Sequence, residues 1–260
     1  MRRSRVIRKI VKVTVPTETI KSRVEKRGTK KTTHVAKKVS KPVRMERKQS
    51  AQDLHRKFGE YGKVEPIWKG ETVYLIGGGP SLAKFKWNRL NSKKTIAINK
   101  AIQFYPNADA LYWTDGRVYT WFREDIDSFK GLKYTIRANG KKDITSLKRG
   151  KKLGIEWAKD TLAHGNNSGC AAINLAIHLG AKRIILLGYD MGSNGTNSHF
   201  HDGYPVNATA ANIYKNQFIP AFDAIAEDIK GKGIQIFNAC PTSKLNAFKK
   251  ITIEEGLAFR

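Results

Sequence analysis

The segment SGCAAINLAIHLGAKRIILLGYD, residues 168–190, limits the possible folds more than any other stretch of the chain. An apolar helix is expected over residues 168–179, where Gly180 ends it, and the apolar run 183–187 indicates a buried strand. A helix that leads directly into a fully apolar strand is typical of parallel sheets with helices on both faces. Asp190 follows the strand, so we expect it at the carboxyl edge of the sheet, where open α/β sheets bind ligands.

The same alternation of strands and helices begins at Glu71. Besides the strand 183–187, the pattern predicts strands at residues 72–76, 95–98, 110–113, 134–137 and 234–237, and a second helix at 213–230. A short amphipathic helix is expected at residues 51–62 because Leu54 and Phe58 are one helical turn apart. We therefore predict a basic, poorly structured arm with this short helix at residues 1–70, followed by a Rossmann-like α/β domain at residues 71–260 with a mostly parallel sheet.

Charge separates these two regions. The chain carries 49 Lys and Arg against 22 Asp and Glu, a net charge of +27, and residues 1–70 hold 22 of the basic and 6 of the acidic residues. Residues 1–50 contain no aromatic side chain, so this segment is not expected to fold alone. Two interpretations stay open: a clamp on nucleic-acid phosphates, or a solvated tail that orders only on a partner protein. The clamp would use Arg2, Arg3, Arg5, Arg8, Lys9, Lys30, Lys31, Lys37 and Lys38.

Cysteine content and hydropathy suggest a compartment. Cys170 and Cys240 stand far apart without metal-ligand spacing, so neither a disulfide framework nor a zinc site is indicated. No apolar run reaches the length of a membrane span. We expect a cytoplasmic protein, and the Arg-rich N-terminus leaves an organellar transit peptide as a minor alternative.

The stretch VYLIGGGPSL is the first candidate site. Gly77, Gly78 and Gly79 would let a phosphate approach the backbone, Pro80 suits the first turn of a helix, and Ser81 offers a hydroxyl. The stretch matches neither GxGxxG nor the GxxxxGK[ST] loop. An anion cradle and a plain tight turn therefore both remain open.

A second candidate lies at NNSGC, residues 166–170. Ser168 is expected to cap the helix that follows, and the start of that helix can also hold a carboxylate or phosphate. Asn167 and Gly169 belong to the same helix start. Asn99 and Asp115 follow two other predicted strands, so they should join the same sheet edge.

The third candidate is the long polar loop GYDMGSNGTNSHFHDGYPVN. Loops of this length in a compact domain are usually functional or disordered. His199 and His201 give too few ligands for a metal site at this spacing, so no metal is expected. A histidine acting as general acid or base and a histidine with only a structural role are the other two interpretations.

Five motifs carry a family resemblance: LIGGGPSL, IAINKAIQF, NNSGCAAINLAIHLGAKRIILLGYDM, HFHDGY and IQIFNACPTSKL, in this order. They resemble the bacterial family 42 sialyltransferases and a related family of motility accessory factors and archaeal 6-hydroxymethylpterin diphosphokinases, of which phages also encode members. The resemblance covers residues 71–248 and leaves the basic arm outside. It implies a Rossmann-like domain that binds a nucleotide-activated donor of the CMP-sugar type and transfers a group without a metal.

The resemblance also implies roles for individual positions. The general base falls on His201, with His199 matching an earlier histidine, or it falls on Tyr204. The nucleotide-binding positions are Gly77, Gly79, Pro80, Ser81, Asn99, Ser168, Gly169 and Asp190, with Gly78, Asp115 and Asn167 beside them. Two departures stand out: Gly78 occupies a position where the sialyltransferases carry asparagine, and Asp115 in TDGR leans toward the diphosphokinases, whose ATP chemistry involves Mg²⁺.

Three functions remain open at this point. The first is a glycosyltransferase-like transferase that uses a nucleotide-activated donor and acts on, or docks to, nucleic acid. The second is a non-catalytic nucleic-acid-binding or virion-associated protein, which loss of the base at Tyr204 would favour. The third is an ATP-dependent diphosphokinase. The sequence leaves the oligomeric state open and suggests the cytoplasm of a bacterium or of a phage-infected cell.

Overall fold

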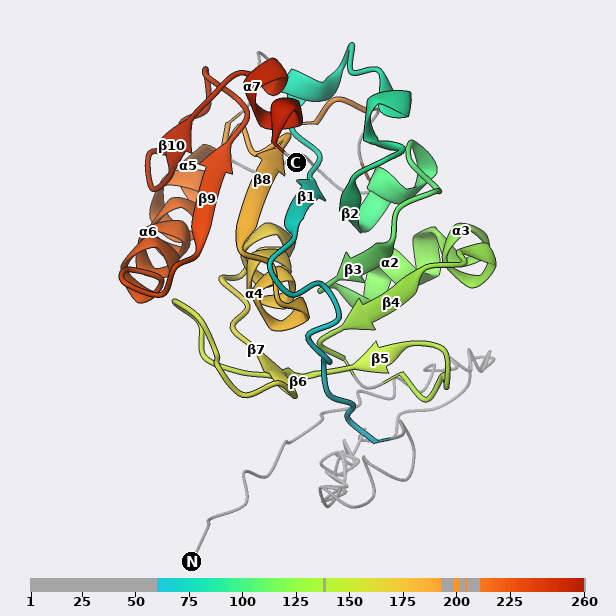
Figure 1. The fold of residues 1–260 in the computed structure, drawn as a ribbon. Helices are drawn as coiled ribbons and strands as arrows, with labels where there is room; N and C mark the ends of the chain where they lie inside the picture. The colour runs from blue at the N-terminus through green and yellow to red at the C-terminus, as the bar shows by residue number, and fades with distance from the viewer. Residues whose placement is uncertain (1–59, 138, 193–198, 202–203, 205–210, 260) are drawn as a thin grey trace, which may run out of the picture. The chain divides into compact units, whose positions relative to one another are not determined.

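A parallel sheet forms the centre of the protein (Figure 1). The computed structural model describes residues 60–137, 139–192, 199–201, 204 and 211–259. These residues form an eight-stranded sheet in the order β10-β9-β8-β1-β2-β3-β4-β5, with every pairing parallel, and a two-stranded sheet β6-β7. The strands are β1 (Thr72–Ile76), β2 (Lys94–Ile98), β3 (Ala110–Trp113), β4 (Leu132–Thr135), β5 (Thr145–Ser146), β6 (Lys148–Arg149), β7 (Thr161–Leu162), β8 (Arg183–Leu187), β9 (Gln235–Asn238) and β10 (Lys249–Lys250). The predicted Rossmann-like α/β fold is confirmed.

Helices and helical turns connect the strands. The α-helices are α2 (Gly116–Trp121), α3 (Arg123–Ser128), α4 (Ser168–Leu179), α5 (Ala211–Ile213), α6 (Ile219–Asp228) and α7 (Ile253–Ala258). Three 3₁₀ turns, η1 (Pro80–Leu82), η2 (Trp87–Leu90) and η3 (Asn99–Gln103), and one π turn, η4 (Tyr214–Phe218), complete the described elements.

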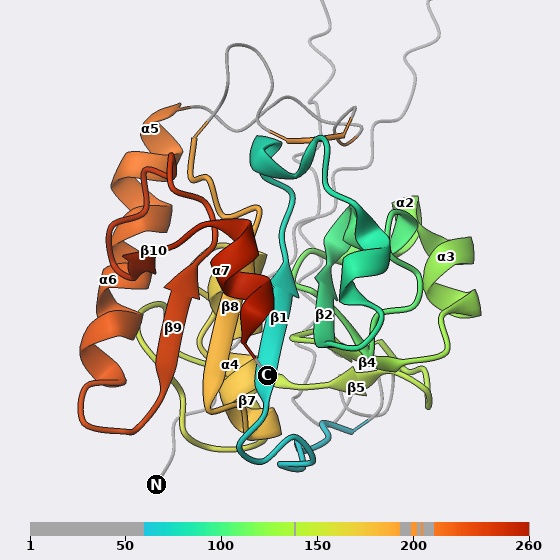
Figure 2. The ribbon, with the colours of Figure 1, turned by 45° about the horizontal axis from the view of Figure 1, so that its top comes forward.

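Strand alternation divides the apolar side chains between two cores. Val73 and Leu75 of β1 belong to the core that contains α4 and α6. Tyr74 and Ile76 point to the opposite face, where they join side chains from the 3₁₀ turns and from α2 and α3. Figure 2 shows α7 in front of β8 and beside β1, and the Tyr74 hydroxyl donates to Gly256 O at 2.9 Å. Both faces of the sheet are therefore covered, as the apolar strands predict.

The strand order reverses direction between β1 and β8. From β1 the chain proceeds through β2, β3, β4 and β5 on one side, and from β8 it proceeds through β9 and β10 on the other. Such a switch point opens a crevice at the carboxyl ends of the two strands, which is the usual ligand site of open α/β sheets. The loops after Ile76 and after Leu187 meet at this point.

Several predicted element bounds differ from the structure. The strands predicted at 72–76, 110–113 and 183–187 and the helix at 168–179 have the observed bounds, whereas β4 lies two residues before the predicted 134–137. Pairing sets this shift, because the register joins Ala110 to Leu132. The predicted helix 213–230 contains a π turn just before α6, since Pro220 has no N–H to continue the α-helical ladder.

The described part of the segment assigned to the arm belongs to the folded unit. Val64 and Trp68 are 1% and 5% exposed and lie in the core with α4. The amide N–H of Trp68 donates to Leu179 O at 2.7 Å. Of the helix predicted at 51–62, residues 60–62 are not helical and the rest lies outside the described residues.

A buried polar network attaches the chain before α4 to that helix. The Asn174 side chain is fully buried, and its Oδ1 accepts from the amides of Glu156 and Ala163 at 2.9 Å each. His178 is also fully buried, and its Nε2 lies 3.0 Å from Thr161 O. Unpaired buried polar groups are costly, so these contacts fix the route of residues 155–163 over α4.

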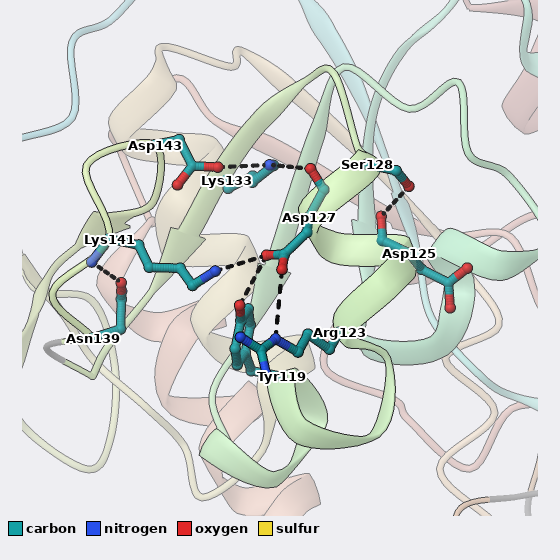
Figure 3. Close-up of polar contacts among 9 residues, drawn as sticks. All are labelled: Tyr119, Arg123, Asp125, Asp127, Ser128, Lys133, Asn139, Lys141 and Asp143. Atoms are coloured by element: carbon teal, nitrogen blue, oxygen red, sulfur yellow. Dashed lines mark hydrogen bonds and ion pairs between the residues drawn. The ribbon is translucent and has the colours of Figure 1, made fainter.

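A second polar network fixes α2 and α3 (Figure 3). The Asp127 carboxylate accepts from the Tyr119 hydroxyl at 2.8 Å and from Lys141 Nζ at 2.9 Å. Lys133, only 6% exposed, pairs with Asp143 at 2.8 Å. Because α2 ends at Trp121, whose ring contacts Tyr204, this network also positions one side of the candidate site.

Candidate functional site

The loops after β1 and β8 are joined by hydrogen bonds. The amides of Gly77 and Gly79 donate to Leu187 O and Gly188 O at 2.8 Å each. The Asp190 carboxylate accepts from Ser81 N at 2.9 Å and from Ser81 Oγ at 2.8 Å. Most N–H groups of the predicted anion cradle are therefore used inside the protein. Gly78 is half-buried, and its amide has no acceptor among the residues that the structure describes.

Close packing explains why glycines occupy this loop. A Cβ atom on Gly79 would overlap Asp190 Oδ2 and lie 2.6 Å from Gly188 O. A Cβ atom on Gly77 would lie 2.8 Å from Gly188 O. The glycines thus permit contact between the two loops, in addition to any approach by a ligand.

The histidine-bearing loop lies against the glycine loop. Phe200 N donates to Gly78 O at 2.9 Å. A Cβ atom on Gly78 would lie 2.8 Å from His199 Cδ2 and 3.5 Å from His201 Nε2. The structure therefore brings the first and third candidate sites of the sequence together at one edge of the sheet.

His199, His201 and Tyr204 form one cluster of rings. The two imidazoles stack with centroids 4.9 Å apart, and each meets the Tyr204 ring edge-on at 5.3 Å. Burial lowers the pKa of His199, and the Lys100 charge acts in the same direction. Burial raises the pKa of Tyr204, while the Lys100 amide, which donates to its hydroxyl at 3.4 Å, acts in the opposite direction. At neutral pH His199 is thus a neutral imidazole and Tyr204 a protonated phenol.

The start of α4 lies beside the glycine loop. Tyr189 separates them: a Cβ atom on Gly77 would lie 3.2 Å from the Tyr189 ring, and one on Gly169 would lie 2.8 Å from it. The Tyr189 hydroxyl donates to Gly169 O at 3.2 Å. The second candidate site therefore adjoins the first across one aromatic ring.

The prediction that Ser168 caps α4 is wrong. Asn167 is the N-cap, because its backbone is extended and its Oδ1 accepts from Cys170 N at 3.1 Å, whereas Ser168 is already helical. Among the described residues, the amides of Ser168 and Gly169 have no acceptor, and the buried Nδ2 of Asn167 has none either. The start of this 12-residue helix thus offers several donors together with the positive end of its dipole.

Unusual backbone conformations gather at the same edge. In the part of the chain that the structure describes, the non-glycine residues with positive φ are Asn99, Asn166 and Met191. They follow β2, precede α4 and follow β8, respectively. Asparagine tolerates this conformation, but methionine rarely adopts it, and such residues often accumulate at functional sites.

Asp115 lies apart from this group. Its carboxylate accepts from Arg117 N at 2.9 Å and pairs with the Arg117 guanidinium at 2.6 Å, so it caps α2. The hydrogen bonds from Arg117 lower the pKa of Asp115. Among the residues that the structure describes, the polar contacts of the Asp115 carboxylate are with Arg117 and not with the histidine or glycine loops. Within the described residues, no three His, Cys, Asp or Glu side chains gather as metal ligands.

Sequence reasoning missed several residues that build the site. The Ser243 hydroxyl donates to Tyr189 O at 2.6 Å, and Lys244 N donates to Asp190 O at 2.9 Å, so the chain after β9 holds the loop after β8. Tyr189 and Lys100 were missed as well. Tyr189 stands directly before Asp190, and its position after a buried strand was the only signal in the sequence.

The nine basic residues predicted to bind nucleic acid, from Arg2 to Lys38, lie outside the described residues. In the described ranges, no helix combines the length and the apolar character that crossing a membrane requires.

Solved structures similar to this chain include three of sialyltransferases. CstII from Campylobacter jejuni with cytidine-5'-monophosphate is 19% identical at a TM-score of 0.46, and the match covers 74% of this chain and 89% of that chain. CST-II with a trisaccharide acceptor and CMP is 18% identical at a TM-score of 0.42, and the match covers 73% of this chain and 89% of that chain. Campylobacter jejuni CstII with CMP-3FNeuAc is 16% identical at a TM-score of 0.42, and the match covers 73% of this chain and 88% of that chain. No protein-family model and no curated protein matches the chain, so family membership stays a prediction.

Gly79→Ala tests the close contact between the two loops. We expect a loss of about 2 kcal/mol in the free energy of unfolding, because the added methyl group meets the Gly188 backbone as well as Asp190. Urea denaturation measures this loss. Gly116→Ala is the matched control, since its Cβ would make only an ordinary contact of 3.5 Å with Arg137. Equal stability of the two variants would contradict the packing argument.

The stability of the fold should fall as the pH drops below about 6.5, the pKa of an unfolded-state histidine. Burial lowers the pKa of His164, His178 and His199, so the unfolded state binds more protons in this range and acid favours unfolding. The stabilisation is complete above this pH and is lost toward the lower folded-state pKa values. Thermal unfolding between about pH 7.5 and 5.5 measures the slope, which His178→Gln should reduce. A slope unchanged in that variant would show that His178 takes no part.

Proposed function

We propose that the protein is a glycosyltransferase-like enzyme that transfers a group from a nucleotide-activated donor bound at the β1–β8 switch point. The observation that carries this proposal is the contact of His199 and His201 with Gly78 at that point. A candidate base thus lies beside the crevice where open α/β sheets bind nucleotides. The resemblance of five sequence motifs to sialyltransferases favours a CMP-sugar as donor.

The donor phosphate would bind at the start of α4 and at the tip of the glycine loop. The amides of Ser168, Gly169 and Gly78 and the Nδ2 of Asn167 are the donors that the described structure leaves without acceptors there. Lys100, whose charge acts on His199, adds a cation near the same place. Ser81 and Asp190, by contrast, support the loop through their mutual hydrogen bonds.

His201 is the general base in this proposal. It would accept the proton of an acceptor hydroxyl while that oxygen attacks the donor sugar, and the bond to the nucleotide phosphate would break. His199 stacks on His201 with the ring centroids 4.9 Å apart, so the proposed base lies directly against a second imidazole. Tyr204 is protonated at neutral pH because burial raises its pKa, so it suits hydrogen-bond donation better than proton abstraction.

His201→Ala tests the assignment of the base. CMP, UDP and ATP are first titrated against the full chain by calorimetry, and donor hydrolysis is then measured with the sugar derivative of the nucleotide that binds. We expect the variant to lose about 10²–10⁴-fold in rate, the usual contribution of a general base, while nucleotide affinity changes little. His34→Ala, in the segment assigned to the arm, is the matched control and should leave the rate unchanged.

The other outcomes separate the remaining functions. Nucleotide binding without turnover would favour a non-catalytic protein. Turnover that requires ATP and Mg²⁺ would favour the diphosphokinase. In the structure the Asp115 carboxylate pairs with Arg117 and the Asp190 carboxylate accepts from Ser81, so a metal ion at either would share that carboxylate with these partners.

Charge supports nucleic acid as an acceptor or docking surface. Residues 1–70 carry a net charge of +16, which attracts polyanions with little sequence preference. Deletion of residues 1–50 should abolish DNA binding in a filter or mobility-shift assay and spare nucleotide binding. Unchanged DNA affinity would remove this part of the proposal.

A further inference from the structure

A basic cavity lies between η2 and the start of α7. Its volume is about 530 Å³. In Figure 2 the chain after β1 lies directly above the end of that strand, next to α7. The cavity is lined by Ser81, Lys84, Phe85, Lys86, Arg89, Ile253 and Glu254.

The lining carries more positive than negative charge. Three of the lining residues, Lys84, Lys86 and Arg89, have cationic side chains, and Glu254 is the one acidic residue in the lining. Arg89 pairs with Glu254 at 3.2 Å across the cavity walls, which leaves Lys84 and Lys86 without an acidic partner among the described residues. Two uncompensated ammonium groups beside an aromatic ring form a suitable place for an anion.

Contacts connect this cavity to the proposed catalytic loop. Ser81 lines the cavity and belongs to the glycine loop through its bonds to Asp190. A series of ring contacts leads from Phe85 to Trp87 at 5.1 Å, from Trp87 to Phe200 at 5.5 Å, and from Phe200 to His201 at 5.1 Å. The cavity lining is therefore joined by ring contacts to the histidine loop, whereas Tyr189 adjoins the glycine loop at Gly77.

We infer that this cavity binds the anionic end of the acceptor, a small molecule that carries a phosphate or a carboxylate group. Its volume falls in the range that holds a compact ligand. The donor phosphate has a separate place at the start of α4, so a second cationic site is available for the other substrate. The identification of the ligand as the acceptor rests on the proposed function, but the charge and shape of the cavity do not.

Charge reversal in the full-length protein tests the inference. The variant Lys84→Glu/Lys86→Glu is titrated at low ionic strength with pyrophosphate and, separately, with citrate, and heat is measured. We expect at least one of these probes to bind about tenfold more weakly, because both point charges beside the anion are reversed. The probe that loses affinity tells whether the site prefers phosphate or carboxylate.

The matched control is Lys130→Glu/Lys142→Glu, which makes the same change of net charge at two exposed lysines away from the cavity. It should bind both probes like the unchanged protein. Equal effects of the two double variants, or no effect of either, would overturn the inference. It would also be overturned if only a single-stranded oligonucleotide lost affinity, because the surface would then bind nucleic acid.

The nucleotide titration separates this inference from the proposed function. The cavity variant should bind CMP, UDP or ATP as the unchanged protein does. If no nucleotide binds to either protein but the probes still distinguish the two double variants, the anion site stands and the proposed function fails. If nucleotide binds normally and the probes show no difference, the proposed function stands and the anion site fails.

Discussion

The contact between the loops after β1 and β8 is the constraint on which the candidate site depends. The Asp190 carboxylate holds Ser81 through both its amide and its hydroxyl, and this is possible only because Gly79 has no side chain. Charge-assisted hydrogen bonds of this kind are among the stronger polar contacts in proteins. They close the switch point at its base and fix the position of Gly78, against which the histidine loop lies.

This arrangement changes the role of the glycine loop. In many nucleotide-binding folds such a loop presents its amides to a phosphate. Here the amides of Gly77, Gly79 and Ser81 bind the neighbouring loop, so the loop acts mainly as a support. Donors for an anion remain at the start of α4, whose distance from the loop is set by the fully buried ring of Tyr189.

Much of the fold followed from the sequence because it depends on local pattern. The predicted bounds agree with the structure for three strands, β1, β3 and β8, and for the helix α4, which Gly180 ends. Each of these apolar segments lies between glycine or polar residues, which mark its ends in the sequence. The bounds of β4 did not follow, because pairing with β3 decides where it begins. The cap of α4 was misassigned by one residue, since Asn167 and Ser168 are both good caps and only the backbone geometry distinguishes them. The contacts of Tyr189 and Lys100 are long-range and leave no local signal.

For the proposed transfer reaction, the electrostatics of the ring cluster suit a histidine better than a tyrosine as general base. Sequence alone left His201 and Tyr204 as alternatives, and the structure places both rings in one cluster, so position does not decide between them. Burial favours the neutral form of both residue types. It therefore raises the pKa of a tyrosine and lowers the pKa of a histidine. For Tyr204 the neutral form keeps its proton, whereas for an imidazole in the same cluster the neutral form has a nitrogen lone pair. The same desolvation therefore prepares a histidine to accept a proton and prevents the tyrosine from doing so.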